Sequence, residues 1–249
     1  MILYFSATGN SSHVAKRIAQ AFGEEAVSIE DCLKAGRTSF SGSRTLGLIT
    51  PTYFWGIPSI VREFLSKVDF GHPGYSYIVS TYGSTPGQSG RIAERVLKGF
   101  RFDAWMGVKM PDTWTPIFDL SDSAANAKKN AAAEPVIDEI ISLVSCRSRG
   151  VFVKHRIPMP IAALYYRTYE LERRTSTLSV APSSCIGCGL CAKKCPAGAI
   201  SMEDGKPAWT KKQCVMCLRC LHRCPKNAIS RGRATRRHGQ YVHPDRLAG

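Results

Sequence analysis

The chain has 249 residues, of which 44% are hydrophobic and 21% are charged. This balance is typical of a soluble globular protein, and the length suggests two domains. It excludes a transmembrane helix, because the longest apolar stretch, around 157–166, has about ten residues where roughly 18 are needed. The first ten residues lack the basic region and cleavage site of a signal peptide, so we expect a cytoplasmic protein with reduced thiols.

The formal net charge of +15 is concentrated in the C-terminal part of the chain. Residues 1–147 hold 15 Lys and Arg against 14 Asp and Glu, whereas residues 148–249 hold 19 against 5. Such asymmetry favours an anionic partner, which could be an acidic protein, an anionic lipid or a nucleic acid.

Strand-like and helix-like segments alternate through the first 144 residues. Helical stripes such as Val14, Ile18, Ala21 and Phe22 follow short apolar runs. In chain order we predict strand 1–6, helix 13–22, strand 26–29, strand 46–50, helix 59–68, strand 75–83, helix 90–99, strand 105–111 and helix 123–144, the last interrupted or restarted at Pro135. This alternation predicts a doubly wound parallel sheet with helices on both faces.

The pattern breaks after residue 147. Residues 148–178 hold two prolines and a possible amphipathic helix at 161–174, and we interpret them as a connector that packs on one or both domains. That helix could instead lie on a membrane surface. The tail 231–249 is basic and weakly apolar, so we expect it to be disordered.

Two cysteine motifs dominate the C-terminal part. "CIGCGLCAKKCP" (185–196) and "CVMCLRCLHRCP" (214–225) share one spacing at an interval of 29 residues, and "CPAGAI" matches "CPKNAI" beyond them. C-x2-C-x2-C-x3-C-P is the run that binds [4Fe–4S] clusters in bacterial ferredoxins, where the fourth cysteine serves the other cluster. We therefore assign one cluster to Cys185, Cys188, Cys191 and Cys224, and the other to Cys214, Cys217, Cys220 and Cys195.

The residues around these motifs suit clusters better than the alternatives. Gly187 and Gly189 let backbone amides approach the sulfurs, and Ile200 and Ile229 can line the cavities. Zinc bound by four cysteines, and disulfides, are the competing interpretations. Eight thiolates and two clusters would carry a formal charge of about −4, which offsets local basic residues and weakens a nucleic-acid interpretation.

The remaining cysteines and His222 are not expected to bind metal. Cys32 and Cys146 lie alone in the sequence and read as ordinary thiols. His222 lies inside the second motif, where four cysteines already complete the ligand set, so we expect it at the surface.

The loop "FSATGNSS" (5–12) has the composition of a phosphate site. Hydroxyls of Ser6, Thr8, Ser11 and Ser12, with amides near Gly9 and Asn10, would surround the start of the first helix. The loop contains neither G-K-[ST] nor G-x-G-x-x-G, so it is not a Walker A or dinucleotide fingerprint. The alternative is a helix-capping turn without a ligand.

Two further loops follow neighbouring strands. "TPTYFWGIP" (50–58) places three aromatic residues in a Pro/Gly frame, and "STYGSTPG" (80–87) follows the next strand. Ligands of open parallel sheets bind outside the carboxyl ends of the strands. Phosphate donors, aromatic walls and a glycine turn together favour flavin mononucleotide (FMN).

These loops resemble those of known flavoproteins. Residues 1–145 resemble a flavodoxin, with a loop close to [ST]-x-T-G-N-[ST], and residues 1–230 resemble the ferrodoxin family, fused flavodoxin–ferredoxin proteins of anaerobes; "PTYFWGIP", "STYG" and "MPDTW" fit that family. The resemblance implies phosphate binding by Ser6, Thr8, Gly9, Asn10 and Ser11. It implies that the isoalloxazine is bracketed by Thr50, Pro51, Thr52, Tyr53, Phe54, Trp55 and Gly56, and by Thr81, Tyr82 and Gly83.

Two points qualify the resemblance. Tyr53, Phe54, Trp55 and Tyr82 are stacking candidates. An aromatic residue alone is more often a core residue, but the positions of Trp55 and Tyr82 in the two loops favour a flavin wall. Flavodoxins usually carry acidic residues near the flavin, yet residues 75–91 contain no Asp or Glu. Flavin potentials typical of flavodoxins are therefore not expected.

The resulting domain prediction has four parts. Residues 1–147 form a flavodoxin-like FMN domain, 148–178 a connector, 179–230 a small α+β ferredoxin domain with two [4Fe–4S] clusters, and 231–249 a basic tail.

We expect an electron-transfer protein whose donor and acceptor are redox proteins, because the chain has no nicotinamide-binding fingerprint. The alternative is a ferredoxin-dependent flavoenzyme that reduces a small acceptor such as a quinone or nitro compound, with 110–118 helping to shape its pocket. A third hypothesis is a binding module that uses 231–239 on nucleic acid or anionic lipid, although we expect no nucleic-acid partner.

Overall fold

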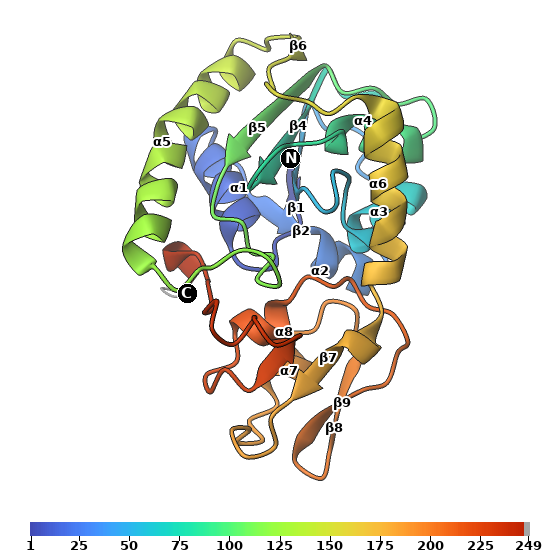
Figure 1. The fold of residues 1–249 in the computed structure, drawn as a ribbon. Helices are drawn as coiled ribbons and strands as arrows, with labels where there is room; N and C mark the ends of the chain where they lie inside the picture. Colours follow the sequence, from blue (N-terminus) through green and yellow to red (C-terminus); the bar gives the residue numbers. More distant parts are fainter. Residues whose placement is uncertain (247–249) are drawn as a thin grey trace.

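The computed structural model describes residues 1–246 and has two parts (Figure 1). A sheet flanked by helices forms the upper part of Figure 1, and a small part that contains both cysteine motifs lies below it. Within the described residues, no helix combines the length and apolar character that crossing a membrane would require.

The upper part is built on six parallel strands in the order β2-β1-β3-β4-β5-β6. The strands are β1 (Ile2–Tyr4), β2 (Ala26–Ser28), β3 (Thr45–Pro51), β4 (Tyr75–Tyr82), β5 (Ala104–Lys109) and β6 (Gly150–Val151). The order reverses between β1 and β3, which gives the doubly wound, flavodoxin-like topology predicted from the sequence. β6 escaped prediction because it has two residues, and it extends the sheet beyond residue 147.

Helices cover both faces of this sheet (Figure 1). They are α1 (Asn10–Ala21), α2 (Ile29–Lys34), α3 (Ser59–Lys67), α4 (Ser89–Val96) and α5 (Ser123–Ser145). One core joins Leu48 to Phe64 of α3, and the other joins Val79 to Ile137 of α5. Strands buried on both faces must be apolar along their whole length, which explains the continuous runs in the sequence.

Helix α5 corrects one expectation. Pro135 does not interrupt the helix, which runs without a break through 23 residues. The Asp122 side chain caps its start by accepting a hydrogen bond from the Ala125 amide at 2.9 Å. Proline removes one helical hydrogen bond, and packing of Ala133 and Ile137 in the core holds the helix on both sides of it.

The lower part is a small α+β unit. Its elements are β7 (Leu178–Val180), α7 (Leu190–Lys193), β8 (Ile200–Glu203), β9 (Lys206–Trp209), α8 (Arg219–His222) and β10 (Ile229–Arg231). β7 pairs antiparallel with β10, and β8 with β9. Each cysteine motif contains a four-residue helix, α7 or α8, so the duplication seen in the sequence is also structural.

Helix α6 (Met159–Glu172) connects the two parts and packs on both. The Tyr166 hydroxyl donates to the Ile57 carbonyl at 2.5 Å in the upper part. The Tyr169 hydroxyl donates to the Val215 carbonyl of the second cysteine motif at 2.5 Å and accepts from the Ser59 amide at 3.2 Å. Helix α6 therefore contacts both parts through these two tyrosines.

The C-terminal tail is not disordered through residue 246, which corrects the prediction; residues 247–249 lie outside the described residues. The Tyr241 hydroxyl lies 2.8 Å from Oδ1 of Asn10 and 2.9 Å from Oδ1 of Asn130. The His243 amide donates to the Thr8 carbonyl at 2.8 Å. Burial, with a smaller effect from neighbouring His13, lowers the pKa of His243 to about 4. Buried residues such as Tyr241 and His243 hold the tail in place. The prediction of disorder rested on the average composition of the tail, which does not reveal such single residues.

Candidate functional site

A cavity of about 210 Å³ lies where the carboxyl ends of β1, β3 and β4 meet. Twelve of the fifteen residues predicted to bind flavin line it: Ser6, Thr8, Asn10, Ser11, Pro51, Thr52, Tyr53, Phe54, Trp55, Thr81, Tyr82 and Gly83. The other three, Gly9, Thr50 and Gly56, do not line it and belong to the same loops.

The phosphate-loop prediction falls on a tight turn before α1. Gly9 has a φ of 113°, a conformation that favours glycine, and its amide donates to Ser6 Oγ at 3.1 Å. The Ser11 hydroxyl lies 2.7 Å from that of Thr81, and Asn10 Nδ2 donates to the Pro111 carbonyl at 3.1 Å. The first amides of a helix have no partner within the helix, so this end of the cavity suits a phosphate group.

Aromatic residues form another part of the cavity wall. Phe54 and Trp55 have positive φ values of 48° and 64°, a strained conformation for bulky residues. The Trp55 ring lies 4.2 Å from that of Tyr165, and the Phe54 ring 5.4 Å from that of Trp114. Tyr165 and Trp114 line the cavity without having been predicted as flavin residues. "MPDTW" gave a partial indication of Trp114, but nothing in the sequence pointed to Tyr165 on α6.

Asp112 supplies the carboxylate that residues 75–91 lack. A Cβ atom added to Gly83 would lie 2.2 Å from the Asp112 side chain, so only glycine allows this approach. The carboxylate accepts from the Trp114 amide at 3.1 Å and from the Ser84 hydroxyl at 3.4 Å. Burial raises the pKa of Asp112, and these hydrogen bonds oppose that shift. One acidic side chain therefore lies in the cavity wall.

The eight motif cysteines gather around two small cavities in the lower part. The first is lined by Cys185, Cys188, Cys191 and Cys224, and the second by Cys195, Cys214, Cys217 and Cys220. The structure thus brings together the two sets that the sequence predicted, each with its fourth cysteine from the other motif. Ile229 lines the first cavity and Ile200 the second.

The donor chemistry fits an iron–sulfur cluster at each cavity. Backbone amides point at sulfur in both repeats, from Ala199 to Cys195 Sγ at 3.4 Å and from Ala228 to Cys224 Sγ at 3.2 Å. Burial raises the pKa of Cys217 to about 12 although the charge of Arg219 opposes the shift, so this thiol stays neutral unless a metal ion binds it. Four thiols in an apolar cavity, with amides directed at sulfur, match what a bound cluster requires.

The two motifs wrap their cavities with the same backbone. Gly187 and Gly189 have φ values of 72° and 70°, and the equivalent Met216 and Leu218 have 52° and 53°. Met216 and Leu218 adopt the left-handed conformation although they are not glycines, which costs conformational energy. Their side chains pack in a buried cluster with Tyr169 and also line the flavin-type cavity.

The two kinds of cavity share a wall. Met216, Cys217 and Leu218 line both the cavity at the sheet and the second cysteine cavity. The first cysteine cavity is lined by none of these three residues. The second cysteine set is therefore adjacent to the predicted flavin site.

Arg219 joins the second motif to the phosphate loop. Its guanidinium group donates to the Ser6 carbonyl at 2.7 Å and the Ala7 carbonyl at 3.3 Å. It also pairs with Glu30 of α2, with Nη1 2.7 Å from Oε2. Arg219 is only 4% exposed, so a buried charge pair connects the two parts. No motif or spacing in the sequence pointed to this residue.

His222 is buried, which corrects the expectation of a surface residue. Its Nε2 donates to the Thr113 carbonyl at 2.9 Å, and its Nδ1 accepts from the Tyr241 amide at 3.2 Å. Burial lowers its pKa to about 4. The ordered tail and the loop after β5 cover the ring, and the spacing of one motif cannot predict either contact. Of the two other cysteines, Cys32 is buried in the core and Cys146 is exposed.

Comparisons with known proteins identify both parts. A flavodoxin domain family matches residues 1–70, and a 4Fe-4S dicluster domain family matches residues 184–229. No curated protein matches the chain.

Solved structures also resemble the chain. A Bacteroides uniformis protein named as a flavoprotein is 20% identical, with a TM-score of 0.36, and the match covers 45% of this chain and 90% of that one. The Trp repressor binding protein of Bacillus subtilis is 14% identical, with a TM-score of 0.34 and coverage of 54% and 95%. Rubredoxin oxygen:oxidoreductase of Desulfovibrio gigas is 15% identical, with a TM-score of 0.38 and coverage of 59% and 36%.

The two domain matches give the chain a fused flavodoxin and ferredoxin architecture. They support iron–sulfur and flavin cofactors and a role in redox electron transfer.

Proposed function

We propose that this fused flavodoxin–ferredoxin chain is an electron carrier that holds two [4Fe–4S] clusters and one FMN and links a donor protein to an acceptor protein. When bound, iron–sulfur clusters exchange single electrons and a flavin exchanges one or two. The observation that carries the proposal is the shared wall: Cys217 lines the second cysteine cavity and also the cavity at the sheet.

Separate sets of residues would hold the FMN and the two clusters. Ser6, Thr8, Gly9, Asn10 and Ser11 would hold the FMN phosphate, and the loops 50–56 and 81–83 would bracket the isoalloxazine. Cys185, Cys188, Cys191 and Cys224 would hold the outer cluster. Cys195, Cys214, Cys217 and Cys220 would hold the inner cluster, beside the flavin.

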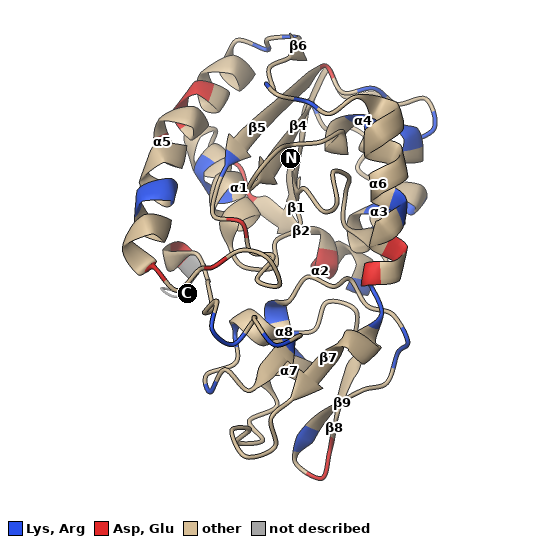
Figure 2. Ribbon diagram, in the orientation of Figure 1, with Lys and Arg blue, Asp and Glu red and all other residues tan. Residues whose placement is uncertain are grey.

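Exposure and charge support entry of electrons at the outer site. Cys188 is exposed, and its neighbour Ile186 is also exposed. Lys193, Lys194 and Lys226 are exposed nearby, and Lys226 lines the first cavity. Figure 2 shows that Lys and Arg outnumber Asp and Glu in this lower part. A donor with an acidic surface would be attracted to this face.

The first test is cofactor content after purification without oxygen. We expect about eight iron, eight acid-labile sulfide and one FMN per chain. Iron and sulfide without FMN, even after FMN is added, would contradict the proposal.

The second test separates the two clusters. Cys188→Ser should remove the outer cluster and slow flavin reduction by a reduced ferredoxin, while direct reduction by dithionite persists. Cys220→Ser should remove the inner cluster with the same effect on the protein donor. Cys146→Ser is the matched control because Cys146 is exposed and lines neither cysteine cavity. Unchanged flavin reduction in both cluster variants would overturn the proposed order of the sites.

Turnover with small acceptors tests the alternative function. Saturable reduction of a quinone or nitro compound, fed by a reduced ferredoxin, would identify a flavoenzyme. Reaction only with acceptor proteins supports the carrier.

A further inference from the structure

A separate group of side chains meets where the C-terminal segment packs on α1. His13 of α1, His243 and Asp245 each offer one potential ligand atom, and these atoms lie within 4.8 Å of one another. None of the three residues lines the flavin-type cavity or either cysteine cavity. The cofactors proposed above therefore leave this group unexplained.

His243 is buried without a hydrogen-bond partner for its ring. The residue is 4% exposed, and within residues 1–246, which the structure describes, neither Nδ1 nor Nε2 makes a hydrogen bond. The ring stacks on that of His13 at a centroid distance of 4.2 Å, and its Nδ1 lies 4.0 Å from Asp245 Oδ1. Buried polar atoms are usually satisfied, so an unpartnered imidazole facing a carboxylate indicates a missing ligand.

His13 is oriented by a second carboxylate. Its Nε2 lies 2.6 Å from Glu134 Oε1, and Glu134 is in turn paired with Arg17. When Nε2 carries the proton and donates to Glu134, Nδ1 keeps its lone pair. Nδ1 faces Asp245 Oδ2, with which it makes a short contact. Histidines that bind metals commonly donate their other ring N–H to a carboxylate in this way.

From this geometry we infer that His13, His243 and Asp245 form a binding site for a divalent transition metal ion of the zinc class. Two imidazoles and one carboxylate suit zinc better than calcium or magnesium, which prefer oxygen ligands. Three protein ligands leave a fourth position of a tetrahedral site for water or another donor. Glu134 acts as a positioning residue for His13.

The site would fasten the tail to the phosphate loop. His13 follows that loop directly on α1, and the His243 amide already bonds to the Thr8 carbonyl at 2.8 Å. Tyr241, two residues before His243, contacts Asn10. A metal shared by His13 and His243 would therefore stabilise both the tail and the loop that begins α1.

The test uses the full chain with its clusters loaded, kept anaerobic and freed of loosely bound metal. Titration with Zn²⁺ should give one site per chain, and Zn²⁺ should raise the thermal unfolding midpoint. His13→Ala and His243→Ala each remove a ligand, so they should abolish the tight site and its thermal shift; Glu134→Gln should weaken binding by about 10–100-fold. His72→Ala is the matched control, since His72 is exposed and lies in the loop before β4.

X-ray absorption at the zinc edge separates this site from the cysteine cavities. Ligand atoms at about 2.0–2.2 Å identify nitrogen and oxygen donors, whereas about 2.3 Å identifies cysteine sulfur. Asp245→Asn changes an exposed side chain and should leave the fold intact. Its lower affinity for Zn²⁺ therefore tests the site even if a histidine variant fails to fold. Equal Zn²⁺ binding in the wild type and these variants, sulfur ligation, or no binding below millimolar Zn²⁺ would overturn the inference.

Discussion

At the scale of single residues, Asp112 brings a carboxylate to the predicted flavin site. It lines the cavity and lies against Gly83 of the loop after β4. A carboxylate in such a wall disfavours added negative charge, because burial limits the screening of its field. The loop after β5 therefore supplies the acidic group that is missing from the loop 80–87.

Asp112→Asn should raise the flavin reduction potential. Removing the negative charge favours reduction by at least about 1.4 kcal/mol, which is about 30 mV for a two-electron couple. Spectroelectrochemical titration at pH 7–8 measures this shift. Because burial raises the pKa of Asp112, its charge is lost on acidification at a higher pH than for an exposed aspartate, so the difference from wild type should shrink as the pH falls. Asp119→Asn is the control, because Asp119 is exposed. Equal potential shifts in Asp112→Asn and Asp119→Asn would contradict a special effect of Asp112 on the flavin.

At the scale of elements, the loops at the ends of β3 and β4 hold each other. Gly87 has a φ of 55°, and a Cβ atom there would lie 2.4 Å from the Trp55 backbone. The Gln88 amide donates to the Trp55 carbonyl at 2.8 Å. The strained aromatic turn at Phe54 and Trp55 is therefore supported by the neighbouring loop.

Gly87→Ala should displace the aromatic turn and weaken FMN binding by about tenfold or more. Gly36→Ala is closely matched, because Gly36 has a φ of 64° but nothing within 4 Å of an added Cβ. The positive φ alone should cost each variant about 1 kcal/mol of unfolding free energy, and only Gly87→Ala adds a steric clash. FMN titration and chemical denaturation measure the two effects. Equal FMN affinity in both variants would show that the contact with Trp55 does not position the wall.

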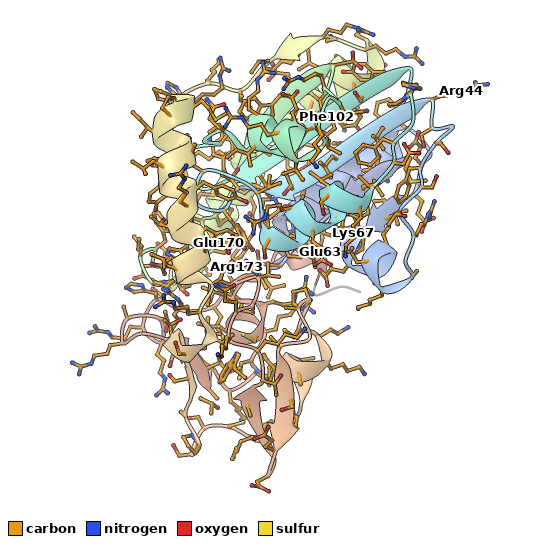
Figure 3. The ribbon with its side chains drawn as sticks, turned by 90° about the vertical axis from the view of Figure 1, so that its right-hand side faces the viewer. Arg44, Glu63, Lys67, Phe102, Glu170 and Arg173 are labelled. Atoms are coloured by element: carbon orange, nitrogen blue, oxygen red, sulfur yellow. The ribbon has the colours of Figure 1, made fainter. Side chains whose placement is uncertain are left out.

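Helix α6 contributes a charge cluster at the boundary between the two parts. Glu170 accepts hydrogen bonds from Arg62 of α3 at 2.5 Å and from Arg173 at 2.7 Å. Arg173 also donates to the Cys214 carbonyl at 2.8 Å. Figure 3 shows Glu170 and Arg173 at the end of α6 where the parts meet, and Glu63 and Lys67 on α3.

Glu170→Gln should lower the unfolding free energy by about 1 kcal/mol, since Glu170 is 42% exposed and solvent screens the pair. Glu63→Gln, in an exposed pair with Lys67, should cost about 0.3–0.5 kcal/mol. Chemical denaturation at pH 7 compares the two variants, and equal losses would contradict a role for the cluster.

The effect of Glu170 should depend on pH. Burial acts to raise the pKa of Glu170, but Arg62 and Arg173 outweigh it and hold the pKa below its usual 4.5. A depressed carboxyl pKa adds stability that is complete above the unfolded-state pKa and is lost as the pH falls through the folded-state value. The gap between wild type and Glu170→Gln should be constant from pH 8 to about 5 and should close below about pH 4.5. Helical circular dichroism follows unfolding, while cluster absorbance reports cluster loss separately.

At the scale of the whole molecule, one buried arginine aligns the two parts. Arg219 extends from α8 to the Ser6 and Ala7 carbonyls and to Glu30. Around it, Tyr53, Phe54 and Trp114 of the upper part pack against Met216 and Leu218 of the lower part. A guanidinium group suits this position because its planar fork can serve carbonyl and carboxylate groups together.

Arg219→Gln should lower the unfolding free energy by about 3 kcal/mol, because Glu30 would be left buried without its partner. FMN affinity should fall as well, since the Ser6 and Ala7 carbonyls lose a donor. Denaturation and FMN titration test both effects. Arg233→Gln is the control, because Arg233 is an exposed arginine of the tail. A variant at Arg219 that matched this control in both measurements would show that the charge pair does not fasten the two parts.

The sequence by itself determined the fold class and pointed to most of the residues that line the candidate cavities. Periodicity predicted the alternating strands and helices, because side-chain burial repeats locally along the chain. Cysteine spacing predicted two sets of four, because one short loop must wrap one cluster. Two features were missed: β6, which has only two residues, and the ordered tail, whose few buried residues lie between basic ones.

Only the tertiary structure decided how these sites meet. Several residues of the candidate sites lie together only because distant segments pack against each other: Asp112, Tyr165, Arg219, His13 and His243. The separation along the chain reaches 232 residues between His13 and Asp245. Such contacts leave no periodic pattern, since each depends on the docking of two separately formed units. The same docking buries His222 and makes Cys217 a wall between the inner cysteine cavity and the flavin-type cavity.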